Sequence, residues 1–96
     1  MSATKHDQEK PDLSMVPREL VEAAARAYMF GAKKYTRGNF KKGFDHSRPL
    51  AACMRHLFAY AAGETLDPES GLSHLDHAAA SLGMLLHSGG ALPGAE

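Results

Sequence analysis

Apolar residues recur every three or four positions in three stretches of the 96-residue chain, which is the spacing of one helical face. The first stretch is rich in alanine and follows Pro17, which suits a first helical turn because its missing N–H needs no partner there. Its periodic positions are Leu20, Val21, Ala24, Tyr28 and Ala32. The pattern predicts a helix over about residues 17–35.

The second stretch carries signals for both helix ends. Ser47 is suited to capping its start, Pro49 to its first turn, and Gly63 to its end, so we predict a helix over about residues 48–63. The apolar stripe that we expect to be buried consists of Leu50, Met54, Leu57 and Ala61.

The third stretch opens with Asp67-Pro68-Glu69, a capping side chain followed by a proline and a first-turn acid. We therefore predict a helix over about residues 68–87 with Asp67 as its N-cap. Asp76 falls outside the apolar face and is expected to point to solvent. That face consists of Leu72, Leu75, Ala79, Leu82 and Leu86.

No internal repeat or strand-like alternation occurs, so the expected fold class is all-α, a three-helix unit. We predict a mobile arm over residues 1–10, a single helical domain over 11–88 and a flexible tail over 89–96. Residues 11–16 bring apolar side chains that we expect to lie across the core. Three short helices cannot cover all the apolar side chains present, so we expect a homo-oligomer, a dimer or higher, that completes the bundle.

Composition excludes several classes of protein. The formal net charge is zero and the pI is near 7, whereas a domain that binds long nucleic acid usually has a basic excess. No apolar run approaches the roughly 20 residues that span a bilayer, and the polar start does not resemble a signal peptide. The single cysteine, Cys53, lies in an apolar run and is expected to be a core residue. These features favour a cytoplasmic protein.

Charge is distributed unevenly along the chain. Residues 31–48 carry a net charge of +5, whereas residues 61–77 carry −4 and no Lys or Arg. Patches of both signs suit a small anion accompanied by a metal ion. The alternative is that both patches are simply solvated faces.

The acidic segment holds the candidate metal ligands. His74 and His77 stand three residues apart and share a helical face, while Glu64, Asp67 and Glu69 fall in the preceding turn. Carboxylates and imidazoles together could hold a divalent metal, with Mg²⁺ or Mn²⁺ expected because these ions favour oxygen donors. Helix capping by Asp67 and a polar edge of histidines are the structural alternatives.

The basic segment and the second helix hold the candidate phosphate ligands. Lys33, Lys34 and Arg55 could bind phosphate, although each also suits an exposed helical position. His56 shares a face with Tyr60 and, two turns on, with Glu64. No P-loop, Gly-x-Ser-x-Gly motif or zinc-type cysteine spacing is present.

Three segments, KHDQEKPDLSMVP, FGAKKYTRGNF and RHLFAYAAGETLDPESGLSHLDHAAASLGMLL, together resemble the dATP/dGTP diphosphohydrolase N-terminal domain family. The resemblance covers about residues 5–86. The family is in turn similar to the all-α MazG-like nucleotide pyrophosphohydrolases, which bind Mg²⁺ through E-E-x-x-E and E-x-x-D motifs. This chain departs from those motifs and has Arg55, His56 and Glu64, then His74 and His77.

The resemblance implies a metal-dependent pyrophosphohydrolase that converts a purine deoxynucleoside triphosphate into the monophosphate and pyrophosphate. The alternatives are a phage protein that binds or sequesters a nucleotide without cleaving it, and a helical assembly domain without a small ligand. We assign residues to three roles on this basis. The catalytic candidates are Glu64, Glu69 and His56, the nucleotide-binding candidates are Lys33, Lys34, Tyr35, Asn39 and Arg55, and the metal candidates are Glu64, Asp67, His74 and His77.

Overall fold

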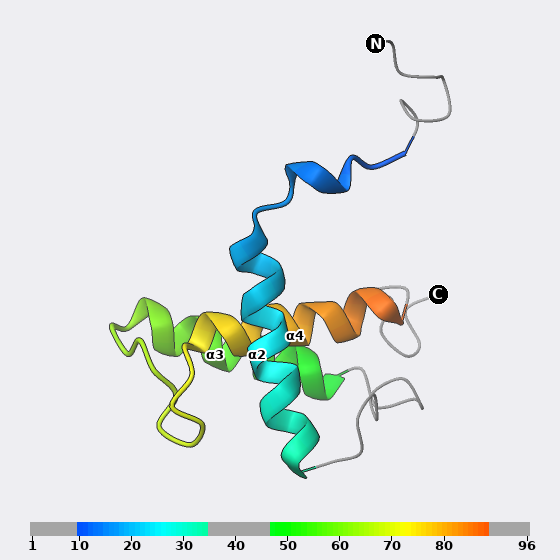
Figure 1. Cartoon of the computed structure of the whole chain (residues 1–96). Coiled ribbons are helices and arrows are strands. Elements are labelled where there is room, and N and C mark those ends of the chain that lie inside the picture. The colour runs from blue at the N-terminus through cyan, green and yellow to red at the C-terminus, as the bar shows by residue number, and fades with distance from the viewer. Residues whose placement is uncertain (1–9, 35–46, 89–96) are drawn as a thin grey trace.

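The computed structural model describes residues 10–34 and 47–88 of the chain (Figure 1). These ranges contain a short 3-10 helix, η1 (Leu13–Met15), and three α-helices, α2 (Arg18–Lys34), α3 (Ser47–Ala61) and α4 (His74–His87). No strand occurs in the two described ranges. The predicted all-α class with three main helices is confirmed.

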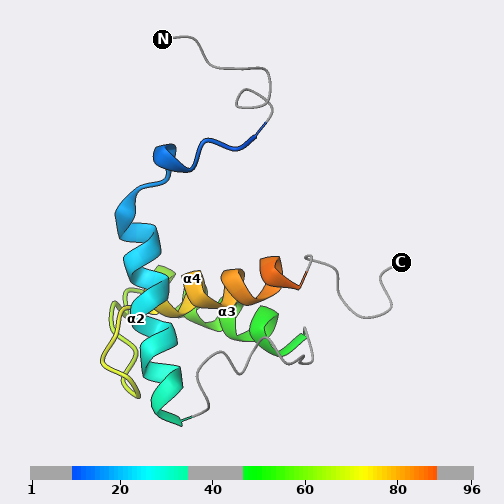
Figure 2. The same ribbon diagram turned by 45° about the vertical axis from the view of Figure 1, so that its right-hand side comes forward.

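Helix α4 is the central element, because it packs against both α3 and α2. Figures 1 and 2 show α3 and α4 side by side and running in opposite directions, with α2 crossing them. The turn between α3 and α4 extends beside the part of α2 that follows this crossing (Figure 1). Residues from all three helices and this turn therefore meet at one end of the α3–α4 pair.

The bounds of the first two helices agree with the predictions to within two residues. The predicted start of the third is wrong, because α4 begins at His74 and its N-cap is Ser73 rather than Asp67. The Ser73 hydroxyl accepts a hydrogen bond from the Leu75 N–H at 3.1 Å, which satisfies one of the free donors of the first turn. The Asp-Pro-Glu signal belongs instead to the turn that precedes α4.

The predicted apolar stripes are largely exposed, which corrects the sequence analysis. Leu57 is 44% exposed and Leu82 is 48% exposed. The helices approach one another through small residues instead, and the larger side chains project outward around these contacts. The buried apolar residues in the described ranges are Ala27, Pro49, Cys53, Ala78 and Ala80. The prediction that Cys53 is a core residue is confirmed, and its burial raises the pKa of the thiol.

One close approach joins α2 to α4. The Tyr28 hydroxyl donates a hydrogen bond to the carbonyl of Ala80 at 2.7 Å and lies directly over Gly83. A Cβ atom at position 83 would collide with this hydroxyl, so the contact requires glycine there. Burial also raises the pKa of the Tyr28 phenol.

A second contact between the same helices is ionic. The Arg26 guanidinium donates two hydrogen bonds to Asp76, from Nε to Oδ2 at 2.8 Å and from Nη2 to Oδ1 at 3.0 Å. The Asp76 side chain is only 5% exposed. The expectation that Asp76 points to solvent is therefore wrong, because its partner lies 50 residues earlier on another helix.

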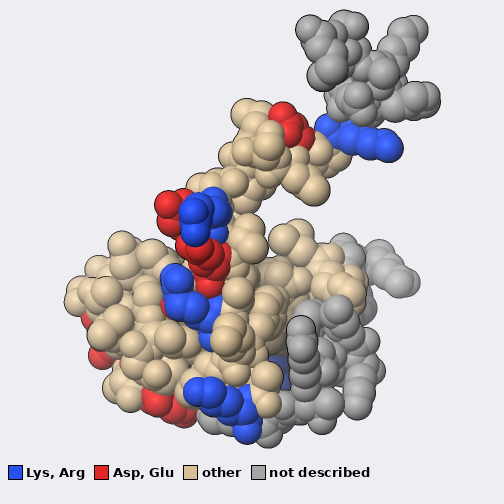
Figure 3. Space-filling view, in the orientation of Figure 1, with Lys and Arg blue, Asp and Glu red and all other residues tan. Residues whose placement is uncertain are grey.

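The segment before α2 also differs from expectation. Leu13 and Met15 are 78% and 81% exposed, so the lead-in does not lie across the core but extends away from the three helices (Figure 2). On the face shown in Figure 3, charged side chains follow α2, and few lie over α4 beside it. None of the described helices is both long and apolar enough to cross a membrane.

Candidate metal centre

Helix α3 ends in a capping turn that places the following residue, Glu64, close to α4. The Glu64 N–H donates to the Ala59 carbonyl and the Gly63 N–H to the Tyr60 carbonyl, each at 3.0 Å, which is the pattern of a Schellman cap. Gly63 has a φ of +102°, a conformation that glycine adopts at little cost. This cap places Glu64 just beyond the helix, where its side chain reaches α4.

The turn that follows is closed at its base. A backbone bridge pairs Leu66 with Ser73, and the His74 N–H donates to the Thr65 carbonyl at 3.0 Å. Within the turn, Asp67 Oδ2 accepts hydrogen bonds from the Ser70 N–H at 3.1 Å and the Ser70 hydroxyl at 2.9 Å. These bonds hold the Asp67 carboxylate beside the first turn of α4.

His74 is the innermost side chain of the group and is 4% exposed. Its Nε2 lies 2.7 Å from Glu64 Oε1, and its Nδ1 lies 2.8 Å from His56 Nδ1. Because a carboxylate accepts, His74 donates from Nε2, and a neutral His74 therefore accepts at Nδ1. His56 then donates from Nδ1 and keeps a free lone pair on Nε2. Both tautomers follow from this network of hydrogen bonds.

His56 projects from α3 toward the turn and α4. Its ring stacks on that of His77 with centroids 4.6 Å apart and planes 14° apart. Burial lowers the pKa of His56, and the neighbouring charge of His77 lowers it further against the opposing effect of Asp67. His74 and Arg55 also lower this pKa, so the surroundings favour a neutral imidazole, which is the form that binds a metal.

His77 occupies the other side of the cluster. Its Nε2 lies 2.6 Å from the Ser70 hydroxyl and 3.6 Å from Asp67 Oδ2, and its ring meets the Phe30 ring edge to face at a centroid distance of 6.0 Å. The Ser70 hydroxyl also accepts from the Leu72 N–H at 3.1 Å. These contacts fix the orientation of His77 from both α2 and the turn.

The proximity of Ser70, His77 and Asp67 does not make a nucleophilic serine. Burial tends to raise the pKa of Asp67, but the hydrogen bonds from Ser70 and the charges of His77 and His56 lower it overall. Asp67 is therefore a carboxylate, and the single hydroxyl proton of Ser70 is donated to it. His77 then donates from Nε2 to Ser70, so it cannot act as a base toward that hydroxyl.

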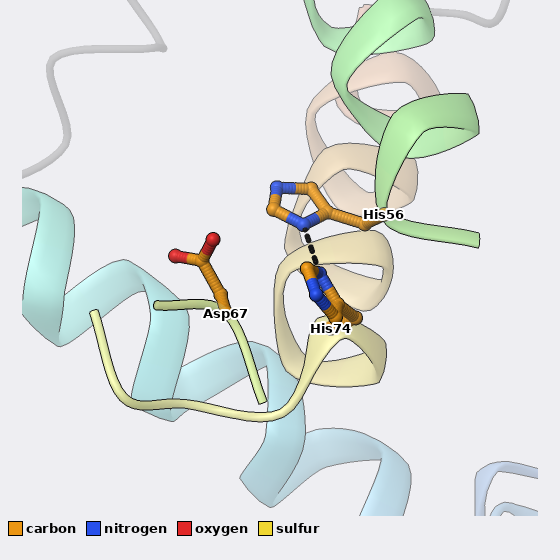
Figure 4. Close-up of side chains that lie close together, drawn as sticks. All are labelled: His56, Asp67 and His74. Atoms are coloured by element: carbon orange, nitrogen blue, oxygen red, sulfur yellow. Dashed lines mark hydrogen bonds between the residues drawn. The ribbon is translucent and has the colours of Figure 1, made fainter. Parts of the chain in front are cut away.

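Three of these side chains have the arrangement of a metal site. One potential ligand atom from each of His56, Asp67 and His74 lies within 4.8 Å of the other two. Figure 4 shows the two rings joined through their Nδ1 atoms, with the carboxylate facing them from the turn. Ligands around a tetrahedral ion lie about 3.3 Å apart when metal–nitrogen bonds are about 2.0–2.1 Å long. The three residues could hold a divalent ion if their ligand atoms moved closer together.

The structure brings together five of the residues singled out in the sequence, and these are His56, Glu64, Asp67, His74 and His77. Arg55 is exposed on α3 but close enough to lower the pKa of His56. Lys33 and Glu69 are exposed, at the end of α2 and in the turn respectively. Tyr35, Asn39 and the side chain of Lys34 lie outside the described residues.

Sequence reasoning missed two participants. Ser70 orders both Asp67 and His77, and Phe30 packs on His77 from α2. The only sequence signal for Ser70 is its position three residues after Asp67, the spacing at which a capping side chain accepts a hydrogen bond from a following backbone N–H. Nothing local to Phe30 indicates its contact with residue 77.

Comparisons with known proteins agree with the resemblance noted in the sequence. A family model described as dATP/dGTP diphosphohydrolase, N-terminal, matches residues 1–91. A protein of Salmonella phage PMBT28, named dATP/dGTP diphosphohydrolase, is 37% identical over 82 residues. The match covers 85% of this chain but only 28% of that relative. No solved structure matches the chain significantly.

Proposed function

The chain belongs to the dATP/dGTP diphosphohydrolase N-terminal family, and from this premise we propose that it carries a metal-dependent site for nucleotide hydrolysis. The proposed reaction converts a purine deoxynucleoside triphosphate into its monophosphate and pyrophosphate. The name of the phage relative supports the class of reaction, while the relative itself extends far beyond the matched segment.

One observation carries the proposal. His56 from α3, Asp67 from the turn and His74 from α4 converge although up to 18 residues separate them in the sequence. A divalent ion held by these residues would neutralise phosphate charge and lower the pKa of a bound water. A helix cap and a polar helix edge would not require two imidazole nitrogens 2.8 Å apart in a largely buried position.

The residues around this group have separable roles in the proposal. Glu64 accepts from His74 Nε2–H and so orients the buried imidazole rather than serving as a metal ligand. His77, fixed by Ser70 and Phe30, lines the same space from α4. Arg55 supplies a positive charge near His56 that suits a phosphate group.

A second candidate function is nucleotide binding without cleavage. The observation that favours it is the engagement of both central carboxylates, Glu64 with His74 and Asp67 with Ser70. The remaining candidate for a general base is His56, but its Nε2 lone pair is free only while Nδ1 keeps its proton and binds no metal ion. If His56 cannot serve, the site holds a nucleotide and its metal but leaves the phosphate chain intact.

Incubation with each deoxynucleoside triphosphate and Mg²⁺, Mn²⁺ or Zn²⁺ tests the hydrolase function. We expect monophosphate and pyrophosphate from dATP or dGTP, and loss of both products in Asp67→Asn. His87→Ala, which removes an imidazole from the far end of α4, serves as the matched control and should retain activity. Recovery of intact nucleotide from a stable complex would instead support binding alone.

A further inference from the structure

We propose that His56, Asp67 and His74 form a site selective for a first-row transition-metal ion over Mg²⁺, and that Glu64 is its positioning residue. The inference rests on the proposed function in taking the same three side chains as ligands. It goes further in assigning the class of ion. The sequence led us to expect Mg²⁺ or Mn²⁺, with Glu64 and His77 among the ligands; the revised site excludes Mg²⁺ and does not use Glu64 or His77 as ligands.

The chemistry of the three ligand atoms favours a transition-metal ion. Two of the three are imidazole nitrogens, which suit ions such as Co²⁺, Ni²⁺ and Zn²⁺. Mg²⁺ prefers oxygen ligands in a near-ideal octahedron and keeps several of its waters. A group with one carboxylate and two imidazoles offers Mg²⁺ little, so its selectivity should follow the order of transition-metal affinities.

The spacing of the two imidazole rings also suits a single metal ion between them. The Nδ1 atoms of His56 and His74 are 2.8 Å apart, and only one proton can lie between them. If the His56 proton moves from Nδ1 to Nε2, both rings stay neutral and both Nδ1 lone pairs can be directed toward one metal ion. Ligands on a tetrahedral ion are about 3.3 Å apart, so the rings need to separate by only about half an ångström.

Glu64 completes an arrangement that is typical of metal-binding histidines. These residues usually donate their second N–H to a carboxylate, which fixes the tautomer and the ring orientation. Glu64 accepts from His74 Nε2–H at 2.7 Å, which leaves Nδ1 for the ion. The His74 side chain is 5% exposed, whereas that of Glu64 is 55% exposed, so Glu64 acts through His74 from the solvent side.

Asp67 supplies the third ligand in a preset position. Both hydrogen bonds from Ser70 fall on Oδ2, and the side chain is 17% exposed. A carboxylate that is already oriented loses little conformational freedom on binding. The three ligand residues are therefore already close together without the ion, and they come from one helix, one turn and the start of a second helix.

Calorimetric titration of the metal-free chain with ZnCl₂, CoCl₂ and MgCl₂, in the absence of nucleotide, tests the proposal. We expect one equivalent of Zn²⁺ to bind at least about 100-fold more tightly than Mg²⁺, with Co²⁺ between them. Equal affinity for Mg²⁺, or no binding of Zn²⁺, would overturn the assignment.

Variants identify the residues. His56→Ala and Asp67→Asn should each abolish tight Zn²⁺ binding, and Glu64→Gln should weaken it about 10–100-fold because it removes only the orienting charge. His87→Ala should bind Zn²⁺ as the unaltered chain does. Circular dichroism establishes that each variant is folded, and two ligand variants are used so that one misfolded protein does not decide the result. Unchanged Zn²⁺ affinity in a folded ligand variant would refute the site.

The outcome separates this inference from the proposed function. Selective Zn²⁺ binding without hydrolysis of any nucleotide would contradict the hydrolase function and leave the metal site standing. Hydrolysis supported by a site that binds Mg²⁺ as tightly as Zn²⁺ would support the function and refute the selectivity.

Discussion

The end of the α3–α4 pair that holds the candidate metal site differs in character from the groove between α2 and α4. Near the site and on the adjoining face of α4, polar side chains are buried, namely His74, Asp76 and Ser81. The groove, with a volume of about 480 Å³, is lined by apolar side chains that remain largely exposed, including Leu20, Val21, Leu82 and Leu86.

The two regions contribute differently to the stability of the fold. A buried polar group destabilises a fold unless it is hydrogen-bonded, and each of the partners around His74 and Asp76 is satisfied within the chain. Apolar burial contributes roughly in proportion to the area removed from water, yet the buried apolar residues of the described ranges are small. The buried polar groups are hydrogen-bonded within one chain, whereas the apolar side chains of the groove are exposed in it.

We expect a second copy of the chain to cover the groove, since the same molecule also presents an apolar lead-in at Leu13 and Met15 that extends away from its own helices. The largest predicted effect follows from placing a charge in the groove. Leu82→Lys should convert a dimer or higher oligomer into a monomer and lower the melting temperature, as measured by light scattering and thermal unfolding.

Met54→Lys is the matched control, because Met54 is 46% exposed on α3, outside the groove. It should leave the assembly intact. A stable 10.3 kDa monomer for the unaltered chain, or dissociation by both variants alike, would contradict this interface.

The next largest effect concerns the polar interior. Arg26→Met leaves the buried Asp76 carboxylate without its ion-pair partner and should destabilise the fold clearly more than the loss of an exposed ion pair does. Arg18→Met is the comparison on the same helix, because it removes only the exposed ion pair between Arg18 and Glu22. It should change the free energy of unfolding by less than about 1 kcal/mol. Chemical denaturation measures both, and equal effects would show that Asp76 is not buried as described.

A smaller effect is expected where the two regions meet. Gly83→Ala should destabilise the fold by about 1–3 kcal/mol, because the added methyl group collides with the Tyr28 hydroxyl. In a Tyr28→Phe background the same substitution should be neutral or stabilising, since alanine favours helix by up to about 1 kcal/mol over glycine. A double-mutant cycle with additive effects would exclude the contact.

The smallest effect is a dependence on alkaline pH. Burial raises the pKa of Tyr28 above its ordinary value of 10.0, so its contribution to stability is complete below pH 10 and is lost as the pH rises toward the folded-state value. Tyr28→Phe should therefore flatten the fall in stability above pH 10. Tyr60→Phe is the control, and an identical flattening there would contradict the assignment to Tyr28.

Local signals predicted the first two helices well, because Pro17, Pro49 and Gly63 act through their immediate backbone. The predicted start of the third helix was wrong because the backbone bridge between Leu66 and Ser73, which pairs across the turn, holds Asp67 outside the helix. The apolar stripes were assigned to the core because periodicity identifies a face but not what covers it.

The candidate site was partly predictable for a similar reason. Helical spacing placed His74 and His77 on one face, and His56 in line with Glu64. The sequence alone could not distinguish the proposed ligands from the orienting residue Glu64. That distinction depends on which nitrogen of His74 contacts His56 and which contacts Glu64. The ion pair of Asp76 could not be predicted from its neighbours in the sequence, because its partner, Arg26, lies 50 positions away.

The central claim is that three side chains of the polar region hold one transition-metal ion. Anomalous diffraction at the zinc absorption edge, from crystals of the zinc-loaded chain, locates the ion directly. The account predicts one strong peak per chain, bonded to Nδ1 of His56, Nδ1 of His74 and a carboxylate oxygen of Asp67, with Glu64 still on His74 Nε2. A peak bound only by exposed residues, or no peak at this group, would contradict it.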